Sequence, residues 1–147
     1  TLPAPDGREI FAWDPAKGLP RVTIQVAGHP IDVHIDAGAM SGLSLPTAMA
    51  TELPLASQPV KMGYAKAVDH RSLVTGAPLR GKVKIGRYTL ENPALRFGDF
   101  LTDVGNMGPP ILRQFTLTID PANSGLWLAG PANGKLTAPV EPVLSSE

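Results

Sequence analysis

The stretch VHIDAGAMSGLSLP, residues 33–46, places one carboxylate between an alternating apolar run and a set of small residues. An acid in this position leaves the core at the end of a strand and has little bulk around it. Asp36 is therefore either a turn-forming residue or a reagent that is open to a substrate. The small residues that follow it are Ala37, Gly38 and Ala39.

Other candidate sites in the sequence are weaker. Asp32, His34 and Asp36 recur with period two, so one strand face could offer them to a divalent metal. Neighbouring side chains on one strand face diverge, however, and a metal needs ligands from elsewhere, so we expect solvated edge residues and no metal site. GAMSGLS is not the Gly-x-Ser-x-Gly motif of a serine hydrolase. RGKVKIG lacks the Ser or Thr and the helix of a phosphate loop, and its lysines are expected on the solvent face of a strand.

The elements that must position Asp36 follow from period-two alternation. Residues 21–35 predict a β-hairpin with AGHP as its turn, and its second strand delivers Asp36. A short helix is expected from Pro46 to Leu53. Residues 56–78 predict a projecting hairpin that could act as a mobile lid. Residues 81–97 predict two or three further strands, and FTLTID and LWL a further hairpin around PANSG.

Length and composition limit the architecture and the partners. The chain has 147 residues, which is enough for one domain with a real core. Its 15 Gly and 16 Pro disfavour a helical bundle and favour short strands joined by turns. Lys plus Arg and Asp plus Glu both total 13, so nucleic acid is an unexpected partner. There is no Cys, and no apolar run approaches the roughly 20 residues of a membrane helix.

The domain organisation is expected to be simple. Residues 1–20 are predicted to be an N-terminal arm with one short strand around Ile10 to Trp13. Residues 21–130 are predicted to form the domain, and residues 131–147 a C-terminal tail or interface segment.

Two motifs, taken in order, carry a family resemblance. VTIQVAGHPIDVHIDAGAMSGLSLP, residues 22–46, resembles the first half of a retropepsin-like aspartic protease, in which a strand ends in apolar-Asp-(Thr/Ser)-Gly-Ala. The family's second landmark is an apolar-apolar-Gly segment that crosses under the catalytic loop, followed by a short helix and a hairpin. NMGPPILRQFTLTIDPANSGLWL, residues 106–128, is similar to it, with Gly108 as the glycine and Pro110 to Phe115 as the helix.

The resemblance implies a fold and an activity. The expected fold is all-β, a small closed barrel or sandwich with a flap hairpin and one or two short helices. The expected activity is endopeptidase cleavage of an extended polypeptide. In such enzymes two carboxylates share one proton and a water, so a rate profile on the acid side should be bell-shaped. Because the chain has only one Asp-x-Gly of the right context, the second acid is expected from Asp36 of a second copy in a homodimer.

The same resemblance assigns the other site residues. Ala37, Gly38, Ala39 and Gly108 would support the catalytic loop. Substrate would lie beneath a flap at residues 62–78 and pair its backbone with strands. No metal or organic cofactor is implied, and a periplasmic or secreted location is expected. The flap residues placed near the substrate are Gly63, Tyr64 and His70.

The sequence departs from the family pattern at two places. Ala37 stands where the family has a Thr or Ser whose hydroxyl ties the two catalytic loops together, a hydrogen bond of about 0.5–1.5 kcal/mol. The second departure is Gly-Pro-Pro after Met107, which a helix start tolerates. Two alternatives to a homodimeric protease therefore stay open: a catalytically silent peptide-binding or assembly module, and one half of a longer two-lobed protease.

Overall fold

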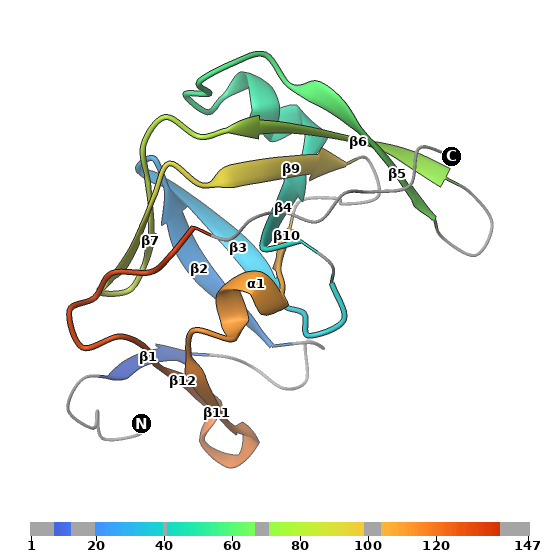
Figure 1. Cartoon of the computed structure of the whole chain (residues 1–147). Helices are drawn as coiled ribbons and strands as arrows, with labels where there is room; N and C mark the ends of the chain where they lie inside the picture. The colour runs from blue at the N-terminus through green and yellow to red at the C-terminus, as the bar shows by residue number, and fades with distance from the viewer. Residues whose placement is uncertain (1–7, 13–19, 40, 67–70, 99–103, 139–147) are drawn as a thin grey trace.

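Two β-sheets make up the fold in the computed structural model, which describes residues 8–12, 20–39, 41–66, 71–98 and 104–138 (Figure 1). The larger sheet has the strand order β5 (Val60–Lys66), β6 (Arg71–Pro78), β9 (Ala94–Gly98), β4 (Leu43–Pro46), β10 (Gly105–Met107), β3 (His29–Ile35), β2 (Arg21–Val26), β7 (Lys82–Ile85) and β8 (Tyr88–Glu91). The smaller sheet has the order β1 (Arg8–Ala12), β12 (Gly125–Ala129) and β11 (Thr116–Asp120). The protein is mainly β, as the sequence predicts.

The hairpin of β2 and β3 forms as expected from its alternation. The turn is two residues long, Ala27 and Gly28, rather than the predicted four. Their φ angles are 49° and 85°, and positive φ at both turn positions matches the twist of a tight hairpin. The apolar residues of both strands face the core, while the residues between them are mostly exposed.

One hydrophobic core joins the two sheets. Buried apolar side chains of the larger sheet pack in the same cluster as Ile111 after β10 and as Leu126 and Leu128 of β12. Tyr88 of β8 is 1% exposed and meets the ring of Phe115 edge to face, with 5.1 Å between ring centroids. The smaller sheet is therefore anchored to the larger one by side-chain packing.

The helical elements are short. The predicted helix after Pro46 is a 3₁₀ turn, η2 (Thr47–Thr51), which ends before Leu53. The helix predicted for residues 110–115 is α1 (Pro109–Leu112), and hydrogen bonds of the tighter i to i+3 kind continue the turn to Phe115. It starts where two prolines occupy first-turn positions, whose missing N–H groups a helix does not need there. A second 3₁₀ turn, η3 (Pro121–Asn123), joins β11 to β12.

Both predicted end segments contribute backbone pairing. β1 pairs with β12 and begins two residues before the predicted strand, whereas Trp13 lies outside the described residues. Residues 134–136 lie alongside β8 and pair with it. Thr89 donates its N–H to Gly134 O at 2.8 Å, and Leu136 donates its N–H to Thr89 O at 2.9 Å. The division into arm, domain and tail stays a prediction.

The hairpin of β5 and β6 extends beyond the rest of the larger sheet (Figure 1). Its register shifts between Lys61 and Gly63, which marks a β-bulge. Gly63 has φ 139°, a conformation that side-chain-bearing residues rarely adopt. This is the hairpin that the sequence predicts as a flap.

Candidate active site

Asp36 lies where three strands meet. It follows β3 directly, and β10 is inserted between β3 and β4, parallel to the first and antiparallel to the second. The chain leaves β3 at Asp36 and returns as β4 at Leu43, and the described residues between these strands, 36–39 and 41–42, form the Asp36 loop. The segment with Met107 and Gly108 crosses between the two ends of this loop. This is the crossing that the second sequence motif predicts.

Backbone hydrogen bonds hold the Asp36 loop in place. The Asp36 N–H donates to Met107 O at 2.9 Å, and the Gly108 N–H donates to Gly42 O at the same distance. Within the loop, the Ala39 N–H donates to Asp36 O at 3.2 Å. The loop is therefore tied to β10 at both of its ends.

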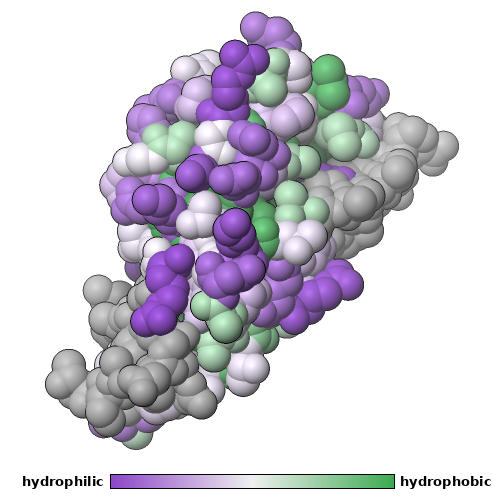
Figure 2. Space-filling view, turned by 60° about the vertical axis from the view of Figure 1, so that its left-hand side comes forward, coloured by the Kyte–Doolittle hydropathy of each residue, from purple (hydrophilic) through white to green (hydrophobic). Residues whose placement is uncertain are grey.

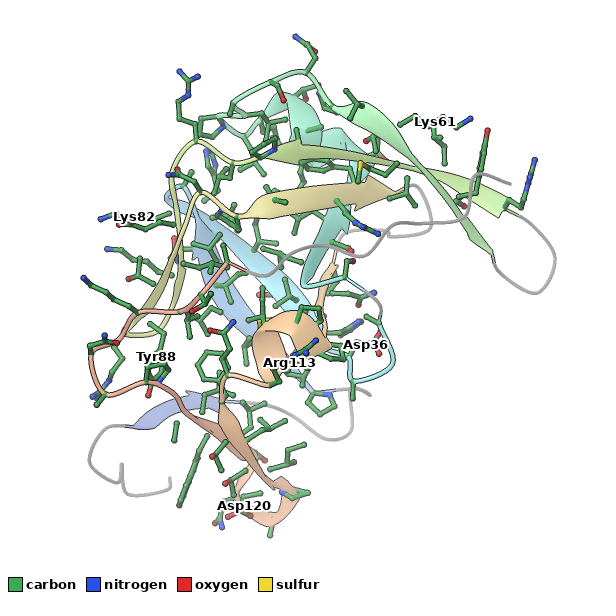
Figure 3. The ribbon with its side chains drawn as sticks, viewed as in Figure 1. Asp36, Lys61, Lys82, Tyr88, Arg113 and Asp120 are labelled. Atoms are coloured by element: carbon green, nitrogen blue, oxygen red, sulfur yellow. The ribbon has the colours of Figure 1, made fainter. Side chains whose placement is uncertain are left out.

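The Asp36 carboxylate is oriented by its own loop. Its Oδ1 accepts the N–H of Gly38 at 3.0 Å, and the side chain is half-buried. A hydrogen bond from the residue two positions on is the Asx-turn geometry, which fixes the side-chain torsion. Figure 3 shows Asp36 at the end of β3, beside the start of α1. The carboxylate is thus held in one orientation and still reachable from solvent.

Gly108 is required by close approach rather than by its torsion angles. Its φ of −110° is ordinary. A Cβ at this position would lie 2.2 Å from Ser41 O and 3.0 Å from Ala39 Cβ. Gly108 therefore allows the β10 segment to pass directly against the Asp36 loop.

The loop residue that follows Asp36 offers no hydrogen bond from its side chain. Ala37 is exposed, and its methyl group cannot link two copies of the loop. A hydroxyl pair occurs further along, where Ser41 Oγ and Ser44 Oγ lie 2.6 Å apart and are buried. That pair joins the end of the loop to β4.

The strand register also gives Asp36 two polar neighbours. His34 precedes Asp36 by two residues and so faces the same side of β3. Asn106 of β10 lies directly opposite His34, and Ser44 of β4 lies directly opposite Asn106. No sequence pattern singles out Asn106, because its place beside His34 depends on a parallel pairing between distant segments. Alternation within β3 indicates only that Asp32 and His34 share the face of Asp36.

The predicted flap residues lie on the β5–β6 hairpin, away from this loop in the chain. Tyr64 has Lys61 Nζ 4.7 Å and Arg71 Cζ 4.5 Å from its ring centroid. The row of His34, Asn106 and Ser44 continues across the sheet through Arg96 of β9 to Gly76 of β6. Tyr64 pairs with Leu73 of β6. Because Leu73 and Gly76 are three residues apart, Leu73 and Tyr64 lie on the opposite face of the sheet from that row.

Tyr64 and Asp36 are therefore on opposite faces of the larger sheet. The Tyr64 ring and the two cations beside it lie on the face of the hairpin that is turned away from the Asp36 side. His70, the third predicted flap residue, lies outside the described residues.

Within the part of the chain that the structure describes, no group of three or more His, Cys, Asp or Glu side chains is placed to hold a metal ion. Asp32, one of the three residues considered as ligands, is exposed and accepts a hydrogen bond from the Thr23 hydroxyl. No described helix has both the length and the apolar character that crossing a bilayer demands.

Comparison with known proteins supports the fold. No family model matches the sequence, and no curated protein matches it. The structure is similar to the crystal structure of a retropepsin-like aspartic protease from Rickettsia conorii, with a TM-score of 0.65 and 21% sequence identity. The alignment covers 83% of this chain and 98% of that chain. The crossing of β10 beneath the Asp36 loop and this likeness lead to one conclusion: the chain has the fold of a retropepsin-like aspartic protease.

Proposed function

We propose that this chain is one protomer of a homodimeric aspartic endopeptidase. The observation that carries the proposal is the position of the Asp36 carboxylate. The Gly38 N–H orients it by donating to Oδ1 at 3.0 Å, and the loop that carries it is hydrogen-bonded to β10 and leaves it reachable from solvent. The retropepsin-like fold supports the same activity. A merely structural aspartate would not need Gly108 and β10 packed so closely against its loop.

The second carboxylate comes from the partner's Asp36. Two acids at short range cannot both ionise, so one keeps a proton. The ionised acid accepts a proton from water, and the water oxygen attacks the peptide carbonyl carbon. The protonated acid donates its proton to the carbonyl oxygen. When the tetrahedral intermediate collapses, the acid that took the proton of water gives it to the amide nitrogen and the C–N bond breaks. The other carboxylate takes a proton from one hydroxyl of the intermediate, which leaves a carboxylic acid and restores the shared proton of the pair.

The substrate is an extended polypeptide that lies between the Asp36 loop and the β5–β6 hairpin. An extended chain can pair its backbone with strand edges while its side chains occupy pockets on alternate sides. His34 and Asn106 border this path because they share the Asp36 side of the sheet. The hairpin acts as the flap over the bound chain.

The test is cleavage of an unbiased peptide mixture at mildly acidic pH, read by mass spectrometry. The parent protein is compared with Asp36→Asn, with Ala37→Thr, and with Asp32→Asn as a matched control from the same strand. Asp36→Asn should lose at least about 100-fold in rate, because a general base is removed. Asp32→Asn should stay within about twofold. The parent's specific activity should rise with protein concentration if two copies build the site.

A second candidate function is favoured by one observation, the exposed methyl group of Ala37. Without a hydroxyl at this position the two loops lose a link of about 0.5–1.5 kcal/mol each. If Ala37→Thr cuts faster than the parent, Ala37 weakens a working protease. If none of the folded variants cuts, the protease proposal is wrong and a silent peptide-binding or assembly module takes its place.

A further inference from the structure

A group of positive charges borders a hollow beside β7 and β8, and Asp36 is not among the residues that line it. Lys82 comes from β7, Arg87 from the turn between β7 and β8, and Lys135 from the segment after β12. Figure 3 shows Lys82 at the left edge of the view and Asp36 nearer the middle, beside α1. The hollow has a volume of about 340 Å³, and the other residues that line it are Thr89, Glu91, Asn133, Gly134 and Leu136.

Backbone pairing fixes the segment that carries Lys135. Thr89 and Lys135 form a parallel bridge, and Thr89 exchanges backbone hydrogen bonds with Gly134 and Leu136 at 2.8 and 2.9 Å. Asn133 Oδ1 accepts the Lys135 N–H at 3.0 Å. Leu136 is 9% exposed and belongs to the core cluster. The backbone beneath Lys135 is therefore part of the folded domain.

The charge around the hollow is unbalanced. Its lining residues include three cations and one carboxylate, Glu91. Glu91 lies 3.7 Å from Lys82 Nζ, but the two side chains are 69% and 59% exposed, and such surface pairs contribute little. Because the whole chain is formally neutral, the three lining cations represent a local concentration of charge. Lys84 lies on the same face of β7, directly opposite Thr89, but does not line the hollow.

This face is visible as a hydrophilic surface. Figure 2, which brings this side of the molecule forward, shows polar and charged side chains over most of the face. Like charges placed together repel one another, and an anion seated among them relieves that repulsion. The sequence motif RGKVKIG, which is no phosphate loop, thus contributes one cation, Lys82, to a hollow whose other cations come from Arg87 and Lys135.

We propose that this hollow binds the phosphate group of a small phosphate monoester. Two lysine ammonium groups, an arginine guanidinium and the Thr89 hydroxyl are donors that suit the oxygens of a tetrahedral dianion. The volume exceeds that of phosphate alone and falls in the range of small-ligand pockets, roughly 300–1,000 Å³. The remaining space accommodates the organic part of the ester. The site is independent of the proposed peptidase activity, because Asp36 lies elsewhere.

The experiment is an NMR titration of the ¹⁵N-labelled full chain with ribose 5-phosphate and with inorganic phosphate, at an ionic strength kept constant with sodium chloride. Saturable shifts are expected at the backbone amides of Thr89, Gly134 and Lys135, with ribose 5-phosphate binding more tightly than inorganic phosphate. Lys135→Gln should weaken binding about fivefold or more, because one charged donor is lost. Lys84→Gln is the matched control, a cation on the same face outside the hollow, and should change affinity by less than about twofold.

Four results would overturn the proposal. The first is a titration that does not saturate, and the second is an equal response to acetate at the same concentration. The third is an equal loss of affinity in Lys84→Gln and Lys135→Gln, which indicates general charge attraction. The fourth is equal affinity for the two phosphate probes, which shows that the hollow does not hold an ester. Amide spectra of both variants that superimpose on the parent outside the hollow establish that each variant is folded.

Discussion

Gly108→Ala tests whether the close contact between β10 and the Asp36 loop is required for stability. The added Cβ would lie 2.2 Å from Ser41 O, 3.0 Å from Ala39 Cβ and 3.3 Å from Ala39 O. A carbon and a carbonyl oxygen do not normally approach within about 3 Å, so the loop or β10 must move by roughly 1 Å. The atoms in the way belong mainly to backbone and cannot rotate aside.

The cost of that movement can be estimated. Overpacking a well-packed site costs about 1–3 kcal/mol, and displacing the loop weakens the 2.9 Å bond from Gly108 N–H to Gly42 O, which adds about 0.5–1.5 kcal/mol. The free energy of unfolding should therefore fall by about 3 kcal/mol. For a chain of this size that lowers the melting temperature by roughly 6–12 °C.

The assay is thermal and urea unfolding followed by circular dichroism, with Gly38→Ala as the matched control. A Cβ at Gly38 meets only Asp36 Oδ1, at 3.5 Å, which is an ordinary contact. Gly38→Ala should cost less than about 1 kcal/mol, since no atom has to move. If Gly108→Ala is as stable as Gly38→Ala, the crossing is not tightly packed and the argument from close approach is refuted.

Two further substitutions test how the C-terminal part of the domain is attached. Tyr88→Phe removes the hydroxyl that accepts the Gly130 N–H at 2.9 Å, and should cost about 1–2 kcal/mol in urea unfolding with an unchanged slope. An unchanged midpoint would show that this bond contributes nothing. Gln114→Ala removes two bonds to Thr137, at 2.7 and 2.8 Å, and should speed amide exchange at Thr137 by about tenfold. Exchange at the parent rate would mean that the segment is held by other contacts.

Much of the candidate site could be predicted from local sequence patterns. Alternation with period two predicts β2 and β3, and the end of that alternation places Asp36 at a strand end. The placement of the β5–β6 hairpin, of the strands in residues 81–97 and of the β11–β12 hairpin follows from the same kind of signal. The reason is physical: side chains alternate between two faces within each strand, so burial of one face is written into neighbouring residues.

Other features depend on pairing between distant segments and stay invisible to such patterns. Alternation within one strand does not show that β10 inserts between β3 and β4, a crossing that only the family resemblance predicts, or that Asn106 lies opposite His34. The same holds for β1 against β12 and for Lys135 against Thr89. The helix after Gly108 is shorter than the sequence indicates, because its later turns tighten before β11 begins.

The sequence by itself determined the all-β character, the position of Asp36 and the order of the two motifs. Only the tertiary structure decided which backbone groups hold the Asp36 loop, which polar residues share its face and which cations border the hollow beside Lys82. These contacts depend on strand register and on the absence of a side chain at Gly108, where Ser41 O would otherwise meet a Cβ at 2.2 Å. Register is a property of paired chains, so it exists only once the sheet has formed.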